Sequence, residues 1–456
     1  MSYILIDLHR LVFDLLNFPS QNNYISISSY IRKYVHITNL CDVDDKYLRK
    51  LDNNIIMQKK YHRISSLKIY ENKITNKITN ITHMKNLKKL YAEGKCNISQ
   101  NDIKDLDLIE LHVSCNPKII NVNHMKSLKI LCAMNGTCGI DQFGIKDLDL
   151  IKLRVAYNQK IKNVNHMKKL KILDASGIII EQDGIKDLDL IKLYADDNPL
   201  INNINHMKSL KILFAEDDCG IDQNGIRDLN LIELHASFNP LINNVNYMKK
   251  IKILHAEGDC GIDQNGIKDL DLIELHACKN LHIRNVNYMK KLKILDACGI
   301  CGIDQNGINC LDLIELFISD NRYIIDVNHM ASLKILYAGD NSGIDQNGIK
   351  NLDLIKLYAS HNPKITNVNH MKNLKILDAG YDDCGIDDFG IKDLDLIELS
   401  ANYNSKITNI NHLKNLKILY ANGETCGIDD LGINDLNLLE LHSYHNTKIK
   451  KNHIKK

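Results

Sequence analysis

The sequence predicts a repeat solenoid, in which short parallel strands stack into one sheet, and two observations support this fold class. The first is internal repetition: one pattern, NHMKSLKILFAEDDCGIDQNGIRDLNLIELHASFNPLINNVNYM, recurs with small changes through most of the 456 residues. The second is the short alternation of apolar and polar residues in each copy, which is typical of strands. Strands so short cannot bury an apolar side alone, so successive copies must stack to form a continuous core.

The repeating unit is about 20–21 residues long and comes in two alternating types. Successive units open at Leu210, Leu231, Ile251 and Leu272, at steps of 21, 20 and 21 residues. The first type contains LKIL-like segments, and the second contains DLIEL-like segments. Together they predict about 19 units in residues 67–446.

Within a unit of the second type, the strand is centred on Leu234 and Ala236. The pattern L-x-x-L-x-A-x-x-N, from Leu231 to Asn239, points the Leu and Ala side chains inward and the residue between them outward. A buried Asn amide after the strand can satisfy backbone groups of neighbouring turns, so we expect an asparagine ladder. The ladder positions are Asn116, Asn158, Asn198, Asn239, Asn280, Asn321, Asn362, Asn404 and Asn446.

The two unit types return from strand to strand in different ways. After the second-type strand, apolar residues fall at every third position, as in Ile242, Val245 and Met248, which favours 3₁₀-like turns over a full helix. The first type returns through Gly-Ile-Asp-Gln-Asn-Gly-Ile, whose glycines permit tight turning. The N-x-H-M return carries His in most copies but Tyr247 or Tyr288 in two, which indicates packing or hydrogen bonding rather than metal ligation.

These units resemble leucine-rich repeats, specifically the short kind with 3₁₀ returns found in internalin-like and phosphatase-regulator-like arrays. The resemblance covers residues 67–446, about five-sixths of the chain. It implies a leucine-rich-repeat horseshoe with a parallel β-sheet on the concave face and 3₁₀ or loop returns on the convex face. It also implies a binding surface without an activity of its own. The chain departs from the family at the third core position of the strand, which is usually Leu and here mostly Ala, as at Ala236.

Residues 1–66 do not repeat cleanly, and we predict a small α-helical N-terminal cap there. The leucines of residues 8–16 share one helical face, and an array needs a cap to shield its first apolar rung. The alternative is an F-box-like segment, because a leucine-rich start, a loop at Pro19 and further helix before the repeats are similar to an F-box followed by leucine-rich repeats. Residues 447–456 form a basic C-terminal tail.

Composition excludes several classes of protein. The chain has 58 Lys+Arg and 56 Asp+Glu, and a net charge of +2 argues against a protein built to bind nucleic acid. No apolar run reaches the roughly 18–20 residues that a membrane span needs, and the N-terminus lacks the features of a signal peptide. We therefore expect an intracellular, cytoplasmic protein, in the host-cell cytoplasm if the source is viral. Six recurring cysteines fit small buried sites rather than a disulfide framework. They are Cys138, Cys219, Cys260, Cys301, Cys384 and Cys426.

No segment predicts a catalytic site, a cofactor or a metal ion. The sequence has no phosphate-binding glycine loop, no nucleophile elbow and no metalloprotease His-Glu pair. His235, His255 and His276 occupy equivalent positions in successive strands, but ring spacing alone does not predict a metal site. We therefore expect the protein not to be an enzyme.

The outward strand positions predict a binding surface on the concave face. Adjacent strands lie about 5 Å apart, so the outward residues from Tyr194 to Tyr358 should form a column of rings broken only by Asp296. Aromatic residues dominate interface hot spots, whereas the alternative is that duplication alone placed similar residues at similar positions. The predicted partner-binding residues are Tyr194, Phe214, His235, His255, His276, Phe317, Tyr337 and Tyr358.

The sequence thus predicts a non-enzymatic scaffold that binds a protein partner on its concave face, and neither nucleic acid nor a membrane. The alternative is the substrate-recognition subunit of a ubiquitin ligase. In that alternative, residues 1–45 bind a ligase linker protein and the array selects the target.

Overall fold

The structure analysed is a computed structural model, in which the chain divides into two compact units, residues 1–229 (unit 1) and 230–456 (unit 2). The predicted N-terminal cap and its F-box-like alternative fall almost entirely outside the described residues, as does most of the basic tail. The residues that the structure describes are 39–40, 64–69, 80–177 and 180–450.

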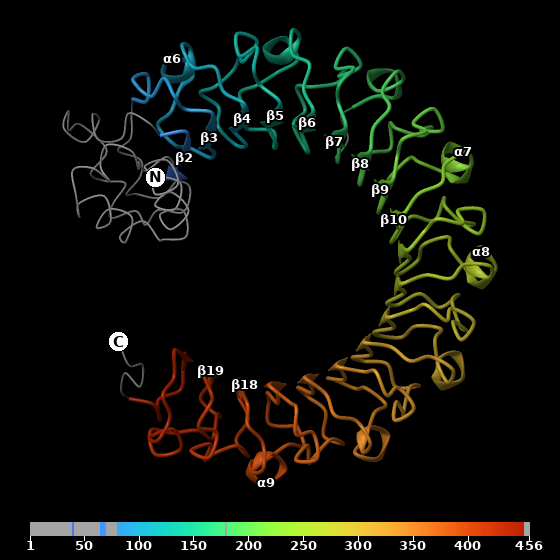
Figure 1. The fold of residues 1–456 in the computed structure, drawn as a ribbon, viewed down its shortest axis with the longest axis vertical. Helices are drawn as coiled ribbons and strands as arrows, with labels where there is room; N and C mark the ends of the chain where they lie inside the picture. Colours follow the sequence, from blue (N-terminus) through green and yellow to red (C-terminus); the bar gives the residue numbers. More distant parts are fainter. Residues whose placement is uncertain (1–38, 41–63, 70–79, 178–179, 451–456) are drawn as a thin grey trace, which may run out of the picture. The chain divides into compact units, whose positions relative to one another are not determined.

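Unit 1 is a stack of short parallel strands, each paired with the next in chain order (Figure 1). Equivalent residues of successive repeats lie opposite one another, as Leu111 does with Leu131. The strands are β1 (Asn39–Leu40), β2 (Ser66–Ile69), β3 (Lys89–Ala92), β4 (Glu110–His112), β5 (Ile130–Cys132), β6 (Lys152–Arg154), β7 (Ile172–Asp174), β8 (Lys192–Tyr194) and β9 (Ile212–Phe214).

Unit 2 repeats the same arrangement, with Leu275 opposite Leu295 in the parallel register. Its strands are β10 (Glu233–His235), β11 (Ile253–His255), β12 (Glu274–His276), β13 (Ile294–Asp296), β14 (Glu315–Phe317), β15 (Ile335–Tyr337), β16 (Lys356–Tyr358), β17 (Ile376–Asp378), β18 (Glu398–Ser400), β19 (Ile418–Tyr420) and β20 (Glu440–His442). From residue 66 onward the described residues contain the 19 strands β2 to β20, which confirms the predicted number of parallel one-rung strands.

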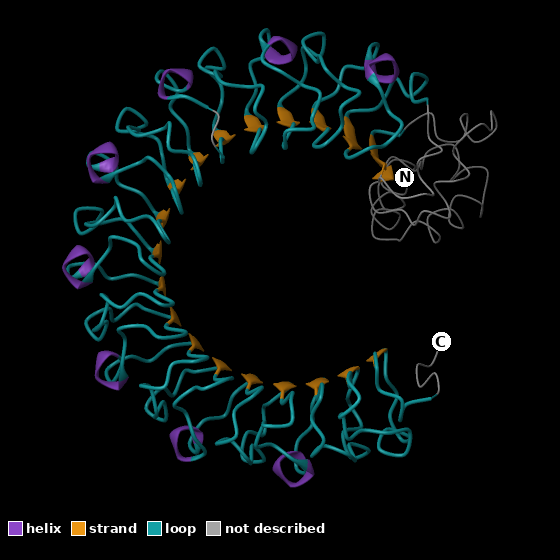
Figure 2. Ribbon diagram, turned by 180° about the vertical axis from the view of Figure 1, so that it is seen from behind, coloured by secondary structure: helices purple, strands orange, loops and turns teal. Residues whose placement is uncertain are grey.

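The core of each unit lies between the strands and their returns. In each unit the strands follow the concave edge and the short helical turns follow the convex edge (Figure 2). The inward residues of the strand pattern, such as Leu234 and Ala236, are fully buried. The predicted architecture, a leucine-rich-repeat solenoid with little helix, is therefore confirmed.

The two predicted kinds of return are both present. In the second-type return, Met248 N donates to Val245 O and Ile251 N donates to Met248 O, both at 3.0 Å, which is the three-residue bonding of 3₁₀ turns. Eight first-type returns, those after β3, β5, β7, β9, β11, β13, β15 and β17, contain one short helical turn each. These turns are α6 (Gln100–Ile103), η2 (Phe143–Ile145), η3 (Gln182–Gly184), α7 (Gln223–Ile226), α8 (Gln264–Ile267), η4 (Gln305–Gly307), η5 (Asn347–Ile349) and α9 (Asp388–Ile391), where η marks a 3₁₀ helix.

Glycine is required in the helical turn because adjacent backbones approach closely there. The Asp263 side chain caps α8 by accepting a hydrogen bond of 2.8 Å from Gly266 N. A Cβ atom on Gly266 would lie only 2.2 Å from Asn243 O of the preceding turn. The repeated Asp-Gln-Asn-Gly sequence therefore encodes both the cap and the close stacking of turns.

The predicted asparagine ladder is confirmed. Asn280 is fully buried, and its Nδ2 donates to Ala256 O at 2.7 Å and to Ile262 O at 3.1 Å. Its Oδ1 accepts from His282 N at 2.8 Å and from Ile283 N at 3.2 Å. Each ladder amide thus ties its own turn to the turn before it.

The histidines of the N-x-H-M returns are structural. His329 Nε2 lies 3.2 Å from Ile308 O of the preceding helical turn. Where Tyr288 replaces the histidine, its hydroxyl donates to the equivalent Ile267 O at 3.0 Å. The interchange of His and Tyr is explained because both rings reach the same carbonyl.

The six recurring cysteines, such as Cys301, are buried free thiols, as predicted. Burial raises the pKa of the Cys301 thiol to about 12, so this thiol is protonated at neutral pH. Among the described residues, no helix has the length and apolar character needed to cross a lipid bilayer.

Candidate functional site

The outward side chains of the strands form the candidate site. In β14, Glu315 and Phe317 are half-buried and flank the buried Leu316, and the other strands of unit 2 share this outward–inward–outward pattern. We call the outward side of β10–β20 the strand face. The third residues of these strands, His235 through His442, form its ring row.

Unit 1 carries two of the predicted binding residues on adjacent strands. The rings of Tyr194 and Phe214 stack with centroids 4.4 Å apart. Lys192 Nζ lies 4.7 Å from both ring centroids, which is a cation–π distance. The Lys192 ammonium group therefore already makes a cation–π contact with both rings.

Two outward positions of unit 1 do not project as the strand pattern predicts. Cys132 and Asp174 are both buried, with exposed fractions of 1% and 4%. Arg154 spans the gap between them and donates from Nε to Asp174 Oδ2 at 3.1 Å.

Three aromatic rings of unit 2 form a continuous stack on β14–β16. The centroids of Phe317 and Tyr337 are 4.3 Å apart, and those of Tyr337 and Tyr358 are 4.2 Å apart with the ring planes within 1° of parallel. Each ring is half-buried by its neighbours rather than fully exposed. The three rings are therefore packed face to face and remain partly exposed.

Three imidazoles form a second stack on β10–β12. The ring centroids of His235 and His255 are 3.9 Å apart, and those of His255 and His276 are 4.1 Å apart. Two of these imidazoles each pair with the glutamate at the first outward position of their own strand. His235 Nε2 lies 2.8 Å from Glu233 Oε1, and His276 Nε2 lies 2.8 Å from Glu274 Oε1.

His276 has the most strongly perturbed environment of the imidazole stack. Burial lowers the pKa of His276, but hydrogen bonds to Asp296 and Glu274 outweigh burial and raise the pKa to about 9. For Asp296, burial acts to raise the pKa, and the hydrogen bonds to His276 and Cys298 bring it below its usual value. His276 is therefore an imidazolium at neutral pH in the chain without a bound ion.

The strand face is acidic. At the first outward position of β10–β20, glutamate alternates with isoleucine except in β16, where Lys356 is the one lysine or arginine at the first or third position of these strands. Asp296 and Asp378 add carboxylates to the ring row. The glutamates are Glu233, Glu274, Glu315, Glu398 and Glu440.

A second set of rings lies beside the strand face, and the sequence pattern did not reveal it. His361 and Tyr381 stack at 3.8 Å, and Tyr381 and Tyr403 stack at 5.4 Å. All three residues have positive φ, between 57° and 72°. The sequence signal for His361 and Tyr403 is their place directly before a ladder asparagine, where the chain leaves the strand.

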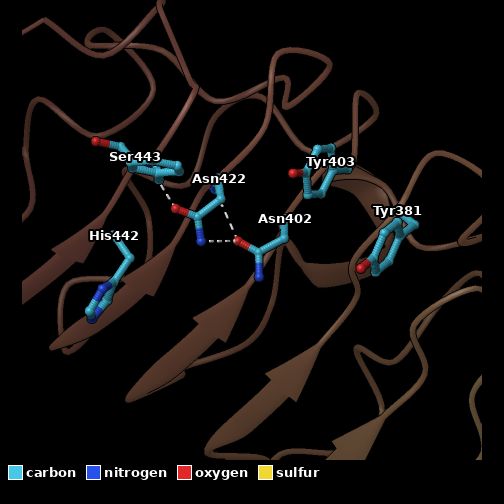
Figure 3. A pocket seen from close by; sticks show the side chains of 7 residues that line it. Tyr381, Asn402, Tyr403, Asn422, His442 and Ser443 are labelled. Atoms are coloured by element: carbon cyan, nitrogen blue, oxygen red, sulfur yellow. Dashed lines mark hydrogen bonds between the residues drawn. The ribbon is translucent and has the colours of Figure 1, made fainter.

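Two of these rings, Tyr381 and Tyr403, line one side of a pocket at the C-terminal end of unit 2 (Figure 3). Asn402 and Asn422 lie in its centre, where Asn422 Nδ2 donates to Asn402 Oδ1 at 2.8 Å. Asn422 Oδ1 accepts from Tyr444 N at 2.6 Å. The pocket is lined by Tyr381, Asn402, Tyr403, Asn422, His442, Ser443 and Tyr444.

All eight predicted binding residues lie at the third position of a strand, two in unit 1 and six in unit 2. Within unit 2 they do not form one unbroken column. The centroids of His276 and Phe317 are 6.5 Å apart with the planes tilted by 42°, because Asp296 lies between them. The structure therefore separates an imidazole stack from an aromatic stack.

The comparisons with known proteins identify no family for this chain. No protein-family model and no curated protein matches the sequence. The TLR13–ssRNA13 complex is similar at 16% identity over 90% of this chain and 74% of that chain, with a TM-score of 0.48. The functional domain of InlJ from Listeria monocytogenes, which includes a cysteine ladder, is similar at 17% identity over 74% and 76%, with a TM-score of 0.36. An internalin (InlF) from Listeria monocytogenes strain 4b F2365 is similar at 14% identity over 82% and 92%, with a TM-score of 0.28.

Proposed function

We propose that this leucine-rich-repeat solenoid is a non-enzymatic scaffold that binds a protein segment on the strand face of unit 2. The single observation that carries the proposal is the stack of Phe317, Tyr337 and Tyr358, with centroids 4.3 and 4.2 Å apart. Rings held in place by their neighbours lose little conformational entropy on binding, and such rings are common hot spots.

The acidic side chains beside the rings favour a partner with Arg and Lys side chains. Glu315 flanks Phe317 on β14, and Asp296 and Asp378 lie at the two ends of the aromatic stack. A guanidinium or ammonium group can pair with these carboxylates and pack over the ring faces or edges. We therefore propose a protein segment rich in basic residues as the ligand.

The same charges disfavour nucleic acid on this surface. Aromatic rings can stack on bases, but binding a phosphate backbone also requires a groove lined with Lys and Arg. On the strand face, the positive charges of Lys356 and the His276 imidazolium are outnumbered by the carboxylates of five glutamates and two aspartates. We accordingly propose neither nucleic acid nor a membrane as the partner.

The experiment begins with peptides selected from a random display library on the full-length protein. We expect the selected peptides to be rich in Arg and Lys, and to bind more weakly as ionic strength rises. Replacing two anchors together, Phe317→Ala with Tyr337→Ala, should weaken the selected peptides by about 30-fold, corresponding to about 2 kcal/mol.

The matched control is Phe389→Ala, which removes a ring that is 75% exposed on α9, away from the strands. This variant should bind the peptides as the parent does. Peptides that are acidic, or that bind the double variant with the affinity of the parent, would contradict the proposed function.

A further inference from the structure

Two histidines and a glutamate on β11 and β12 come close enough to share an ion. One ligand atom from each of His255, Glu274 and His276 lies within 4.8 Å of the other two. The two imidazole planes are 6° from parallel, with centroids 4.1 Å apart. All three side chains are largely covered, with exposed fractions of 21%, 25% and 17%.

We propose that His255, Glu274 and His276 bind a divalent transition-metal ion such as Zn²⁺. The ion would take Nε2 of each imidazole and one carboxylate oxygen of Glu274. Zinc–nitrogen and zinc–oxygen bonds of about 2.0–2.2 Å require ligand atoms roughly 3.5 Å apart. The two imidazoles, which are nearly parallel, must therefore rotate until both Nε2 lone pairs point at one ion. This inference concerns a different part of the strand face from the aromatic stack and does not depend on peptide binding.

Carboxylates on the opposite edge of the rings place the nitrogens correctly for this role. Asp296 Oδ2 lies 3.5 Å from His276 Nδ1, and Glu257 Oε1 lies 3.8 Å from His255 Nδ1. Asp296 is itself held by Cys298 N, which donates to its Oδ1 at 3.0 Å. Asp296 next to Nδ1 favours the Nδ1–H tautomer of a neutral His276, so Nε2 can bind the metal once it gives up the proton directed at Glu274. Glu257 is too far from His255 Nδ1 for a hydrogen bond and contributes its charge.

The negative charge of the cluster also favours binding of a cation. Glu257, Glu274 and Asp296 place three carboxylates around two imidazoles, so the half-buried group keeps a net negative charge even when His276 is protonated. An ion with two positive charges compensates it better than one proton does. Imidazole nitrogens select Zn²⁺, Co²⁺, Ni²⁺ or Cu²⁺ over Mg²⁺ and Ca²⁺, and three protein ligands leave a further position for water or a partner group.

A second Glu-His pair in the chain provides a matched control. On β4, His112 Nε2 lies 2.9 Å from Glu110 Oε1, as in the pair on β12. The ring that stacks on His112 is Tyr91, at 4.2 Å, and not a second imidazole. The pair on β4 therefore has the same local sequence, Glu-Leu-His, without the third ligand.

The test is titration of the full-length, reduced protein with Co²⁺, followed by its d–d absorption bands, with Zn²⁺ added as competitor. We expect one equivalent whose spectrum lacks thiolate-to-cobalt charge transfer and which Zn²⁺ displaces. His255→Gln and His276→Gln should each lose this equivalent, and Glu274→Gln should do the same with the least change in packing. Asp296→Asn should weaken it by about 10–100-fold, because Asp296 positions a ligand without being one.

His112→Gln should leave this equivalent unchanged, and circular dichroism should show that every variant is folded. The proposal is overturned if the folded Glu274→Gln variant binds Co²⁺ as the parent does. It is also overturned if His112→Gln loses the same equivalent, because the metal would then be bound at the Glu110–His112 pair on β4.

Discussion

Replacement of one ladder asparagine, Asn280→Ala, should destabilise unit 2 strongly. The Asn280 amide bonds four buried or half-buried backbone groups, the carbonyls of Ala256 and Ile262 and the N–H groups of His282 and Ile283. A buried polar group without a partner costs about 1–3 kcal/mol, so leaving two of the four unsatisfied costs about 2–6 kcal/mol.

The assay is native-state hydrogen exchange on the full-length protein, because long repeat arrays need not unfold in a single transition. Backbone amides in the two turns that Asn280 joins should exchange faster in Asn280→Ala than in the parent protein. The increase in exchange rate should correspond to the loss of about 2–6 kcal/mol. The control is Asn265→Ala, the same chemical change at an exposed position on α8, which should cost within about 0.5 kcal/mol. A cost below about 1 kcal/mol for Asn280→Ala would refute the structural role of the ladder.

Three further predictions concern the ring row and the N-terminal segment. Tyr337→Ala should lower stability by about 1–3 kcal/mol in urea unfolding, since it removes two ring stacks worth about 0.5–1.5 kcal/mol each; an unchanged midpoint would mean that the stacks are not formed. Because the pKa of His276 is raised in the folded chain to about 9, its stabilising contribution should be fully present below about pH 6.5 and lost as pH rises through about 9. The loss should be at most about 3 kcal/mol, and His276→Gln should abolish this pH dependence. If the alternative ligase-subunit function holds, a ligase linker protein should co-purify with the intact chain from cells and be lost when residues 1–45 are deleted.

The regular part of the fold could be predicted from the sequence because every repeat has the same inward apolar residues and imposes the same packing requirement. An inward Leu at 234 and an inward Ala at 236 require a strand, and the following Asn239 requires backbone partners in the neighbouring turn. A constraint repeated along the whole array leaves little freedom in register. The returns were predicted for the same reason, from the three-residue apolar step and from the glycines.

The details of the site depend on contacts between repeats, which the spacing within one repeat does not fix. The sequence pattern predicts that His276 and Asp296 lie on adjacent strands. It does not predict the contact of 3.5 Å between His276 Nδ1 and Asp296 Oδ2. It overlooked Glu257, although the alternation continues two residues beyond His255. It also overlooked the second set of rings, because Tyr403 reaches its place through a positive φ of 57°, outside the strand pattern.

We propose that partners bind the strand face of unit 2, and site-specific photo-crosslinking can locate the bound peptide. The photoreactive residue p-benzoylphenylalanine would replace Tyr337 in one sample and Phe389 in the other, and each would be irradiated with a selected basic peptide. We expect a crosslinked product from position 337, in the middle of the aromatic stack, and none from position 389 on α9. A crosslink at position 389 with none at position 337 would contradict it.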